Sequence, residues 1–260
     1  MGVVMFKRFL VFAYGLACYA VFFATFLYAV GFVGNIVVPR TIDGPRVGDL
    51  SSSLLIDLVL LMAFSIQHSV MARPAFKRWW TRLIPEATER STYVLASSVA
   101  LIALFVYWRP LGGTVWSVQA SIGSSLLHAM FAFGWLLVLV STFVIDHFDL
   151  FGLRQVWLHL MGVPYRPIGF RAPGPYRLVR HPLYVGWLFA FWATPTMTAT
   201  HLLFAVATTA YIMVAIQLEE QDLVDSLGSA YADYRENVPM LIPFKRKRRA
   251  SDLARGAISA

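Results

Sequence analysis

The chain has 260 residues, of which 58% are hydrophobic and only 14% are charged. This composition excludes an ordinary soluble domain and predicts an all-α integral membrane protein that crosses the bilayer several times. The formal net charge is +8, but the basic residues lie in alternate loops and in the tail, as membrane topology requires, so no nucleic-acid partner is expected.

Long apolar runs predict the membrane-spanning segments. Four of them fall in the first 145 residues, over residues 9–33, 54–71, 93–108 and 122–145. A polar loop follows over residues 146–181, and two more apolar segments, 182–194 and 199–218, form a helical hairpin. The first segment of the hairpin would be only about 20 Å long as a helix. We therefore predict five to six transmembrane helices.

These segments are expected to form one membrane domain over residues 1–260. Within it, residues 1–145 supply four transmembrane helices, residues 146–181 a cytoplasmic loop, residues 182–243 the hairpin and tail that carry the cofactor site, and residues 244–260 a basic tail.

The distribution of basic residues predicts the orientation. The loops after the second and fourth spans carry five basic residues each, whereas the third loop has Arg109 alone and the hairpin tip has none. Because Lys and Arg are retained on the cytoplasmic side, both termini and the two basic loops are expected to face the cytoplasm. The expected location is the bacterial inner membrane, with membrane lipid around the helices.

Three ordered blocks of polar residues bracket the hairpin. They read Arg180-His181-Pro182-x-Tyr184-x-Gly186, then Glu219-Glu220-x-x-Leu223, then Tyr231-x-x-Tyr234-x-x-x-Val238-Pro239. Ionisable groups beside hydrocarbon are costly unless they serve a site. The blocks resemble the C-terminal region of the isoprenylcysteine carboxyl methyltransferase family, whose members are membrane-embedded helical enzymes that bind S-adenosylmethionine.

The same residue types suit this cofactor chemically. A helix that begins at Pro182 would present N–H groups and a positive dipole end to a carboxylate, and Arg177 or Arg180 could add a charged donor. Tyrosines offer aromatic faces for adenine or the sulfonium, and Glu219 could accept hydrogen bonds from ribose or amine. The resemblance implies that Tyr176, His181 to Tyr184 (with Pro182 and Leu183) and Glu219 contact the cofactor, and, with less support, Ile168 to Arg171.

One position departs from the carboxyl methyltransferases. The arginine that in that family lies four residues before the first Glu, and helps to bind the substrate carboxylate, is Ala215 here. The segments Ser65 to Trp80 and Asp146 to Leu160 instead resemble the NnrU-like membrane proteins and the bacterial methanethiol S-methyltransferases. This resemblance implies S-adenosylmethionine-dependent methylation of methanethiol to dimethyl sulfide.

Methylation of a thiol requires a thiolate, and therefore a base within hydrogen-bond reach of the sulfur. The candidates are His147, which we favour, and His68, Asp146 and Asp149, with Arg154 as a partner for the thiolate. A single interfacial histidine is more often a residue hydrogen-bonded to the backbone than a catalytic base, so the choice stays open.

Other functions remain compatible with the sequence. They are an isoprenylcysteine-type or lipid methyltransferase, an NADPH-dependent membrane reductase of the sterol type, and a non-enzymatic membrane protein. No metal is expected, because the chain has a single cysteine and its histidines lack metal-ligand spacing.

Overall fold

The computed structural model describes residues 2–244, so the basic run Lys245 to Arg249 lies outside the described residues. The described part is almost wholly helical. Its elements are α1 (Gly2–Gly34), α2 (Leu50–Ala72), α3 (Pro74–Trp80), η1 (Glu86–Thr88), α4 (Glu89–Tyr107), β1 (Thr114–Ser117), α5 (Ser121–Ile145), α6 (His147–Leu150), α7 (Leu153–Met161), η2 (Gly174–Arg177), α8 (Pro182–Trp192), β2 (Thr196–Thr198), α9 (Ala199–Leu227) and α10 (Ser229–Asn237).

Five helices are long and apolar enough to cross a membrane: α1, α2, α4 together with η1, α5 and α9. The prediction of an all-α integral membrane protein is confirmed. Helix α9 continues nine residues beyond the apolar run, to Leu227, because Glu, Gln and Leu favour helix in water as well as in lipid. Gly228, with a φ of +61°, then ends it.

Helix α8 is shorter than the other spans. Its 11 residues rise only about 16 Å at 1.5 Å per residue. The chain continues in extended form, and β2 pairs with β1 in an antiparallel two-stranded sheet at the far end of the bundle. The fifth crossing therefore combines a short helix with an extended segment, and the sequence did not predict this sheet.

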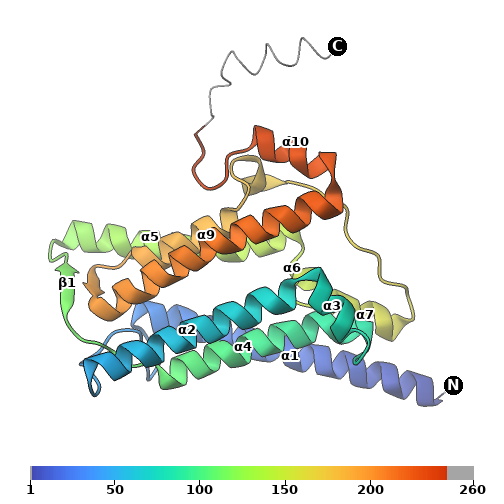
Figure 1. The fold of residues 1–260 in the computed structure, drawn as a ribbon, viewed down its shortest axis with the longest axis horizontal. Helices are drawn as coiled ribbons and strands as arrows, with labels where there is room; N and C mark the ends of the chain where they lie inside the picture. The colour runs from blue at the N-terminus through green and yellow to red at the C-terminus, as the bar shows by residue number, and fades with distance from the viewer. Residues whose placement is uncertain (1, 245–260) are drawn as a thin grey trace, which may run out of the picture.

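The loops separate cleanly onto the two ends of the helix bundle. Figure 1 shows the N-terminus, α3, α6, α7 and α10 at one end, and β1 at the other. At the β1 end the backbone of Val47 donates to Pro110, and that of Ala199 donates to Gly113. The two basic loops and the C-terminal blocks thus share one end, as the charge pattern predicted; we call it the basic end.

Two glycines allow α5 and α8 to pack with their backbones in contact. A Cβ atom on Gly186 would lie 2.7 Å from the carbonyl oxygen of Gly134 and 2.8 Å from the backbone nitrogen of Val138. Small residues at such contacts are typical of membrane helix packing. This contact fixes α8, and with it the residues at its N-terminus.

Aromatic side chains fill the centre of the bundle. Phe32, Phe105, Trp108, Phe191 and Phe204 are buried members of one hydrophobic cluster. Trp108 and Phe204 meet edge to face at 5.9 Å, and Phe191 and Phe204 at 5.0 Å. The cluster therefore joins α1 and α4 to the C-terminal hairpin.

Candidate active site

The adjacent glutamates on α9 face different surroundings. Glu220 is buried, and its Oε1 accepts from Nε of Arg180 at 2.7 Å and lies 2.9 Å from Nε2 of His181. Glu219 keeps 45% of its side chain exposed, and its Oε2 accepts from the Tyr184 hydroxyl at 3.0 Å. Glu220 therefore joins α9 to the start of α8, whereas Glu219 has oxygen surface left for a ligand.

The C-terminal tail closes over the start of α8. Nη1 of Arg180 donates to the carbonyls of Arg235 and Val238, and the backbone N–H groups of Arg180 and His181 donate to Pro239 and Met240. This pairing explains why the Val-Pro motif follows the tyrosines. It also means that Arg180 is already committed within the protein, so the exposed Arg177 is the freer of the two predicted donors.

Two predicted N–H donors remain at the helix start. Leu183 and Tyr184 occupy the first turn of α8, and among the described residues neither backbone N–H has a partner. Their carbonyl partners would have to lie one turn earlier, where the helix has not begun. Pro182 has no N–H to satisfy. The start of α8 thus offers two adjacent N–H donors, one of them on Tyr184, the residue whose hydroxyl donates to Glu219.

Three aromatic residues, Tyr176, Tyr234 and Phe170, pack near the Glu219 carboxylate. Burial raises the pKa of the Tyr176 hydroxyl, and the nearby charge of Glu219 raises it further. The Tyr234 hydroxyl donates to the Tyr176 carbonyl at 2.6 Å, and the Phe170 ring packs at 5.3 Å from Tyr234. The segment Ile168 to Arg171 therefore lies against α10, next to the other predicted contact residues.

His68 takes part in a short hydrogen-bond chain between α2 and α4. The Tyr93 hydroxyl lies 2.9 Å from Nε2 of His68 and 3.1 Å from Nδ1, and Nδ1 lies 3.1 Å from Oγ of Ser97. The Ser97 hydroxyl donates to the Tyr93 carbonyl at 3.0 Å, so its oxygen must accept from Nδ1–H. Nε2 is then unprotonated and accepts from the Tyr93 hydroxyl.

His147 takes part in a chain of the same kind, between α1, α5 and α6. Its Nε2 lies 2.8 Å from the Tyr19 hydroxyl and its Nδ1 lies 2.9 Å from Oγ1 of Thr142, whose own hydroxyl donates to Leu139. Burial lowers the pKa of His147, against a smaller opposite effect of Asp146, and so favours the neutral ring. Both histidines are thus held as neutral acceptors by a tyrosine.

The two histidines differ in whether the charge of Glu219 acts on the tyrosine to which each is bonded. The charge of Glu219 acts on the hydroxyls of Tyr93, Tyr184 and Tyr211. No such effect on Tyr19 or His147 is found. Helices α2 and α9 are also joined directly, since the Ser69 and Tyr211 hydroxyls lie 3.1 Å apart. The structure therefore brings His68, and not His147, to the Glu219 side.

Asp149 and Arg154 form a separate network in the long loop. Nη1 of Arg154 pairs with Oδ1 of Asp149 at 2.8 Å, and its guanidinium carbon lies 5.3 Å from the centre of the Tyr165 ring. The Tyr165 hydroxyl and Gln155 also donate to Asp149. Asp146 caps α6 by accepting from the Asp149 backbone. These charges are satisfied by one another, as in a loop that is folded on itself.

Known proteins of similar sequence settle the family. The chain is 55% identical to a protein of Crocosphaera subtropica named methanethiol S-methyltransferase, over 93% of this chain and 95% of that one. It is 53% identical to one of the same name from Mycobacterium tuberculosis, over 93% of this chain and 99% of that one. The chain belongs to the methanethiol S-methyltransferase family.

A more distant relative shares part of the chain. Nurim of Mus musculus is 35% identical over 66% of this chain and 68% of its own length. No family model and no solved structure matches. Membership of the methanethiol S-methyltransferase family thus rests on relatives that align along nearly the whole chain, including α2, α4 and the C-terminal blocks.

Three residues near the candidate site of this methanethiol S-methyltransferase family member, Tyr93, Ser97 and Tyr211, are not predicted by the sequence. Tyr93 and Ser97 lie four residues apart in an apolar span, where hydroxyls are ordinary packing residues. Tyr211 lies two turns before Glu219 on α9 and one turn before Ala215. Their spacing of four residues places Tyr211, Ala215 and Glu219 on one face of α9. This spacing is the feature of the sequence that could have indicated Tyr211.

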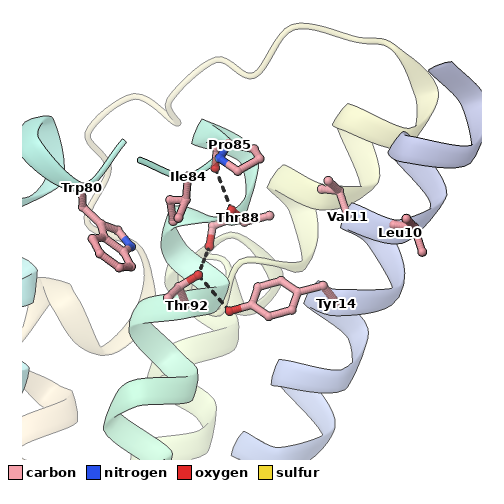
Figure 2. Close-up of a pocket in the computed structure, with 8 residues that line it drawn as sticks. All are labelled: Leu10, Val11, Tyr14, Trp80, Ile84, Pro85, Thr88 and Thr92. Atoms are coloured by element: carbon pink, nitrogen blue, oxygen red, sulfur yellow. Dashed lines mark hydrogen bonds between the residues drawn. The ribbon is translucent and has the colours of Figure 1, made fainter. Parts of the chain in front are cut away.

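An open groove lies elsewhere on the same end of the molecule (Figure 2). It has a volume of about 420 Å³ and is lined by α1, α4 and the segment between α3 and η1. Tyr14 and Trp80 stand on opposite walls, and the Tyr14 hydroxyl is 2.9 Å from Oγ1 of Thr92. The residues that line the groove include none of the C-terminal blocks.

Proposed function

We propose that this chain transfers a methyl group from S-adenosylmethionine to methanethiol and so produces dimethyl sulfide. The observation that carries the proposal is the 50–55% identity to four proteins named methanethiol S-methyltransferase over at least 92% of the chain. The absence of a basic residue at Ala215 agrees with a neutral acceptor, since a carboxylate substrate would be left without a counter-charge.

The residues at the start of α8 and on α9 fit S-adenosylmethionine. This group supplies a methyl bonded to a positively charged sulfur, which a thiolate can attack. The half-exposed Glu219 carboxylate can accept from hydroxyl or ammonium groups, and the N–H groups of Leu183 and Tyr184 can donate to a carboxylate. Tyr176 and Tyr184 supply aromatic faces suited to a cation.

In this proposal His181, Pro182 and Arg180 act differently from Glu219. The buried pair between His181 and Glu220 and the bonds from Arg180 to the tail hold the helix start in place. Such support keeps the donor groups from moving when the ligand binds, and preorganised groups lose less free energy on binding.

On the acceptor side we assign the base to His68 rather than to His147. Both are neutral acceptors bonded to a tyrosine, but the partner of His68 lies within the electrostatic range of Glu219. A base must lie within reach of the proton it removes. In this proposal Asp149 and Arg154 organise the long loop and do not take part in the chemistry.

In this proposal the thiol that accepts the methyl group binds inside the helix bundle. The methyl donor, S-adenosylmethionine, binds where the bundle opens at its basic end. Methanethiol is small and lipophilic and can enter from the bilayer, and S-adenosylmethionine is water-soluble and must enter from the cytoplasm. The excess of basic residues at this end supports a cytoplasmic orientation in a bacterial inner membrane, with lipid around the exposed apolar faces.

Headspace gas analysis of the purified full chain in lipid vesicles tests this function. With S-adenosylmethionine and methanethiol both supplied, dimethyl sulfide is expected, and omission of either compound should abolish it. A second sample supplied with a prenylated cysteine substrate is the control. Faster methylation of its carboxylate than of methanethiol would contradict the proposal.

A further inference from the structure

The Tyr93 hydroxyl lies within reach of both ring nitrogens of His68 and closer to Nε2, and the last acceptor of the chain Tyr93–His68–Ser97 assigns its direction. A carbonyl oxygen can only accept, so the Ser97 hydroxyl donates to the Tyr93 carbonyl, His68 donates to Ser97, and Tyr93 donates to His68. The hydroxyl hydrogen of Tyr93 therefore points to His68. The lone pairs of the Tyr93 oxygen are left to accept a hydrogen bond from another group.

The surroundings of Tyr93 are unusual for a buried hydroxyl. Arg90 lies one turn before it on α4, and its charge acts on the Tyr93 oxygen. Nε of Arg90 is buried and has no partner among the described residues. Glu219 and Tyr211 act on the same oxygen from α9, and Glu89 acts on it from α4. The Tyr93 oxygen is therefore near a cation whose Nε–H has no partner among the described residues, and near Glu219, the carboxylate proposed to bind the methyl donor.

A second cation lies beside Arg90 on this side of the molecule. Lys77 of α3 lies close to Arg90, and its pKa is lowered by burial and then by the charge of Arg90. The charges of Glu89 and Asp222 raise the pKa of Lys77, but by less than burial and Arg90 lower it. Asp222 is itself paired with Arg73 at 2.8 Å. Arg90, the cation that acts on the Tyr93 oxygen, would stabilise a thiolate formed there against the opposing charges of Glu219 and Glu89.

We propose that Tyr93 is a catalytic residue that contacts the acceptor thiol, with His68 acting through it and Arg90 stabilising the thiolate. The inference rests on the proposed function. The S–H bond breaks and its proton passes to the Tyr93 oxygen, while the Tyr93 hydroxyl proton passes to Nε2 of His68. The electron pair of the S–H bond stays on sulfur. His68 ends protonated and returns the proton to water after the reaction.

The molecule contains its own control. Tyr19 donates to His147, and His147 donates to Thr142, in the same arrangement but away from Glu219. Removing either tyrosine hydroxyl removes one comparable hydrogen bond to a histidine. A loss of activity specific to Tyr93 therefore cannot be ascribed to loss of a buried tyrosine–histidine bond alone.

The first experiment compares Tyr93→Phe with Tyr19→Phe in the full chain. Tyr93→Phe is expected to lower kcat for methanethiol by about 10²–10⁴-fold near neutral pH, the usual contribution of a proton-transfer group. Part of the loss should be recovered at high pH, where methanethiol ionises unaided. Tyr19→Phe should stay near the wild-type rate. Calorimetry with S-adenosylhomocysteine should show unchanged affinity in both variants.

The second experiment needs no loss of packing. 3-Fluorotyrosine introduced at position 93 keeps the hydroxyl but makes it more acidic, so the pH dependence of kcat/KM should move to lower pH. The fluorine resonance of the protein loaded with S-adenosylhomocysteine should also move when methanethiol is added. The same probe at position 19 should show neither change.

The outcomes separate this inference from the function on which it rests. If the wild-type chain makes no dimethyl sulfide, the proposed function fails. If the wild type is active but Tyr93→Phe stays within about twofold of it, or the resonance at position 93 does not respond to methanethiol, only the role of Tyr93 is overturned. Equal losses in Tyr93→Phe and Tyr19→Phe would also overturn it.

Discussion

Nε2 of His181 lies 2.9 Å from Oε1 of Glu220, and the same oxygen accepts from Arg180. The neighbouring Glu219 is half exposed; its Oε2 accepts from the Tyr184 hydroxyl and lies 4.0 Å from Nδ1 of His181. Two adjacent glutamates therefore have separate roles, since successive residues on a helix point about 100° apart. Glu220 holds α8, α9 and the tail together, and Glu219 is the glutamate that we propose binds the ligand.

Exchanging each glutamate for glutamine should separate these roles. Glu220→Gln leaves Arg180 and His181 without their carboxylate, and loss of one partner of a buried ion pair costs about 3–5 kcal/mol. Glu219→Gln should leave the thermal unfolding of the detergent-solubilised protein nearly unchanged, yet weaken binding of S-adenosylhomocysteine in calorimetry. A stable Glu220→Gln, or full affinity in Glu219→Gln, would contradict the division.

The contact between Gly134 and Gly186 predicts that α8 cannot tolerate a larger residue at its middle. Gly186→Ala would place a methyl group 2.7 Å from the Gly134 carbonyl oxygen and should destabilise the protein by about 1–3 kcal/mol or more. Gly2→Ala, where nothing lies within 4 Å, is the matched control. Both are read from the midpoint of thermal unfolding; equal midpoints would show that α5 and α8 can separate at little cost.

Ala215 is predicted to keep space open for the acceptor. It lies one turn after Tyr211 and one turn before Glu219 on the same face of α9. Ala215→Arg should lower kcat/KM for methanethiol by at least about 10-fold, since even a methylene of misfit costs that much in a fitted site. Affinity for S-adenosylhomocysteine should be kept. Unchanged turnover would place the acceptor away from this face.

Asp43 joins the first loop to the hairpin tip at the β1 end. Its carboxylate accepts from Asn35 at 2.6 Å and from Thr198, and it lies 3.3 Å from Nδ1 of His201, which is buried. Burial raises the pKa of Asp43, but the hydrogen bonds of His201 and Thr198 and the charge of His201 outweigh it, so the pKa is lowered.

A lowered pKa in the folded state fixes the sign of the pH effect. The contribution of Asp43 to stability is present above its unfolded pKa, about 3.9, and is lost as pH falls through the lower folded value. Thermal unfolding measured from pH 7 to about pH 2 should show this loss, and Asp43→Asn should remove that part of the pH dependence. The same pH dependence in both proteins would assign it to other carboxylates.

The orientation can be tested with reporter fusions. A reporter after residue 244 should be active only in the cytoplasm, and one placed in the loop over residues 35–49 should be active only outside. The loop over residues 35–49 lies at the β1 end, and α10, which precedes the C-terminal reporter, lies away from it, so the two reporters are expected to give opposite results. An external C-terminal reporter would put Glu219 on the side that lacks S-adenosylmethionine and would contradict the proposed function.

The sequence alone determined the membrane class, the long spans and the common end of the C-terminal blocks. Apolar runs and loop charge carry this information directly, because hydrocarbon thickness and the positive-inside bias act on local stretches of chain. Family motifs likewise identified Glu219 and the start of α8 as candidate cofactor contacts; that assignment stays a prediction.

Only the tertiary structure decided which polar residues meet. The sequence favoured His147 over His68, and both occur in the same tyrosine–histidine arrangement. What separates them is the packing of α2 against both α4 and α9, which brings Tyr93 near Glu219 although the two residues are 126 positions apart in the chain. Helix periodicity gives the face of each helix but not its neighbour, because that choice depends on side-chain packing across the whole bundle.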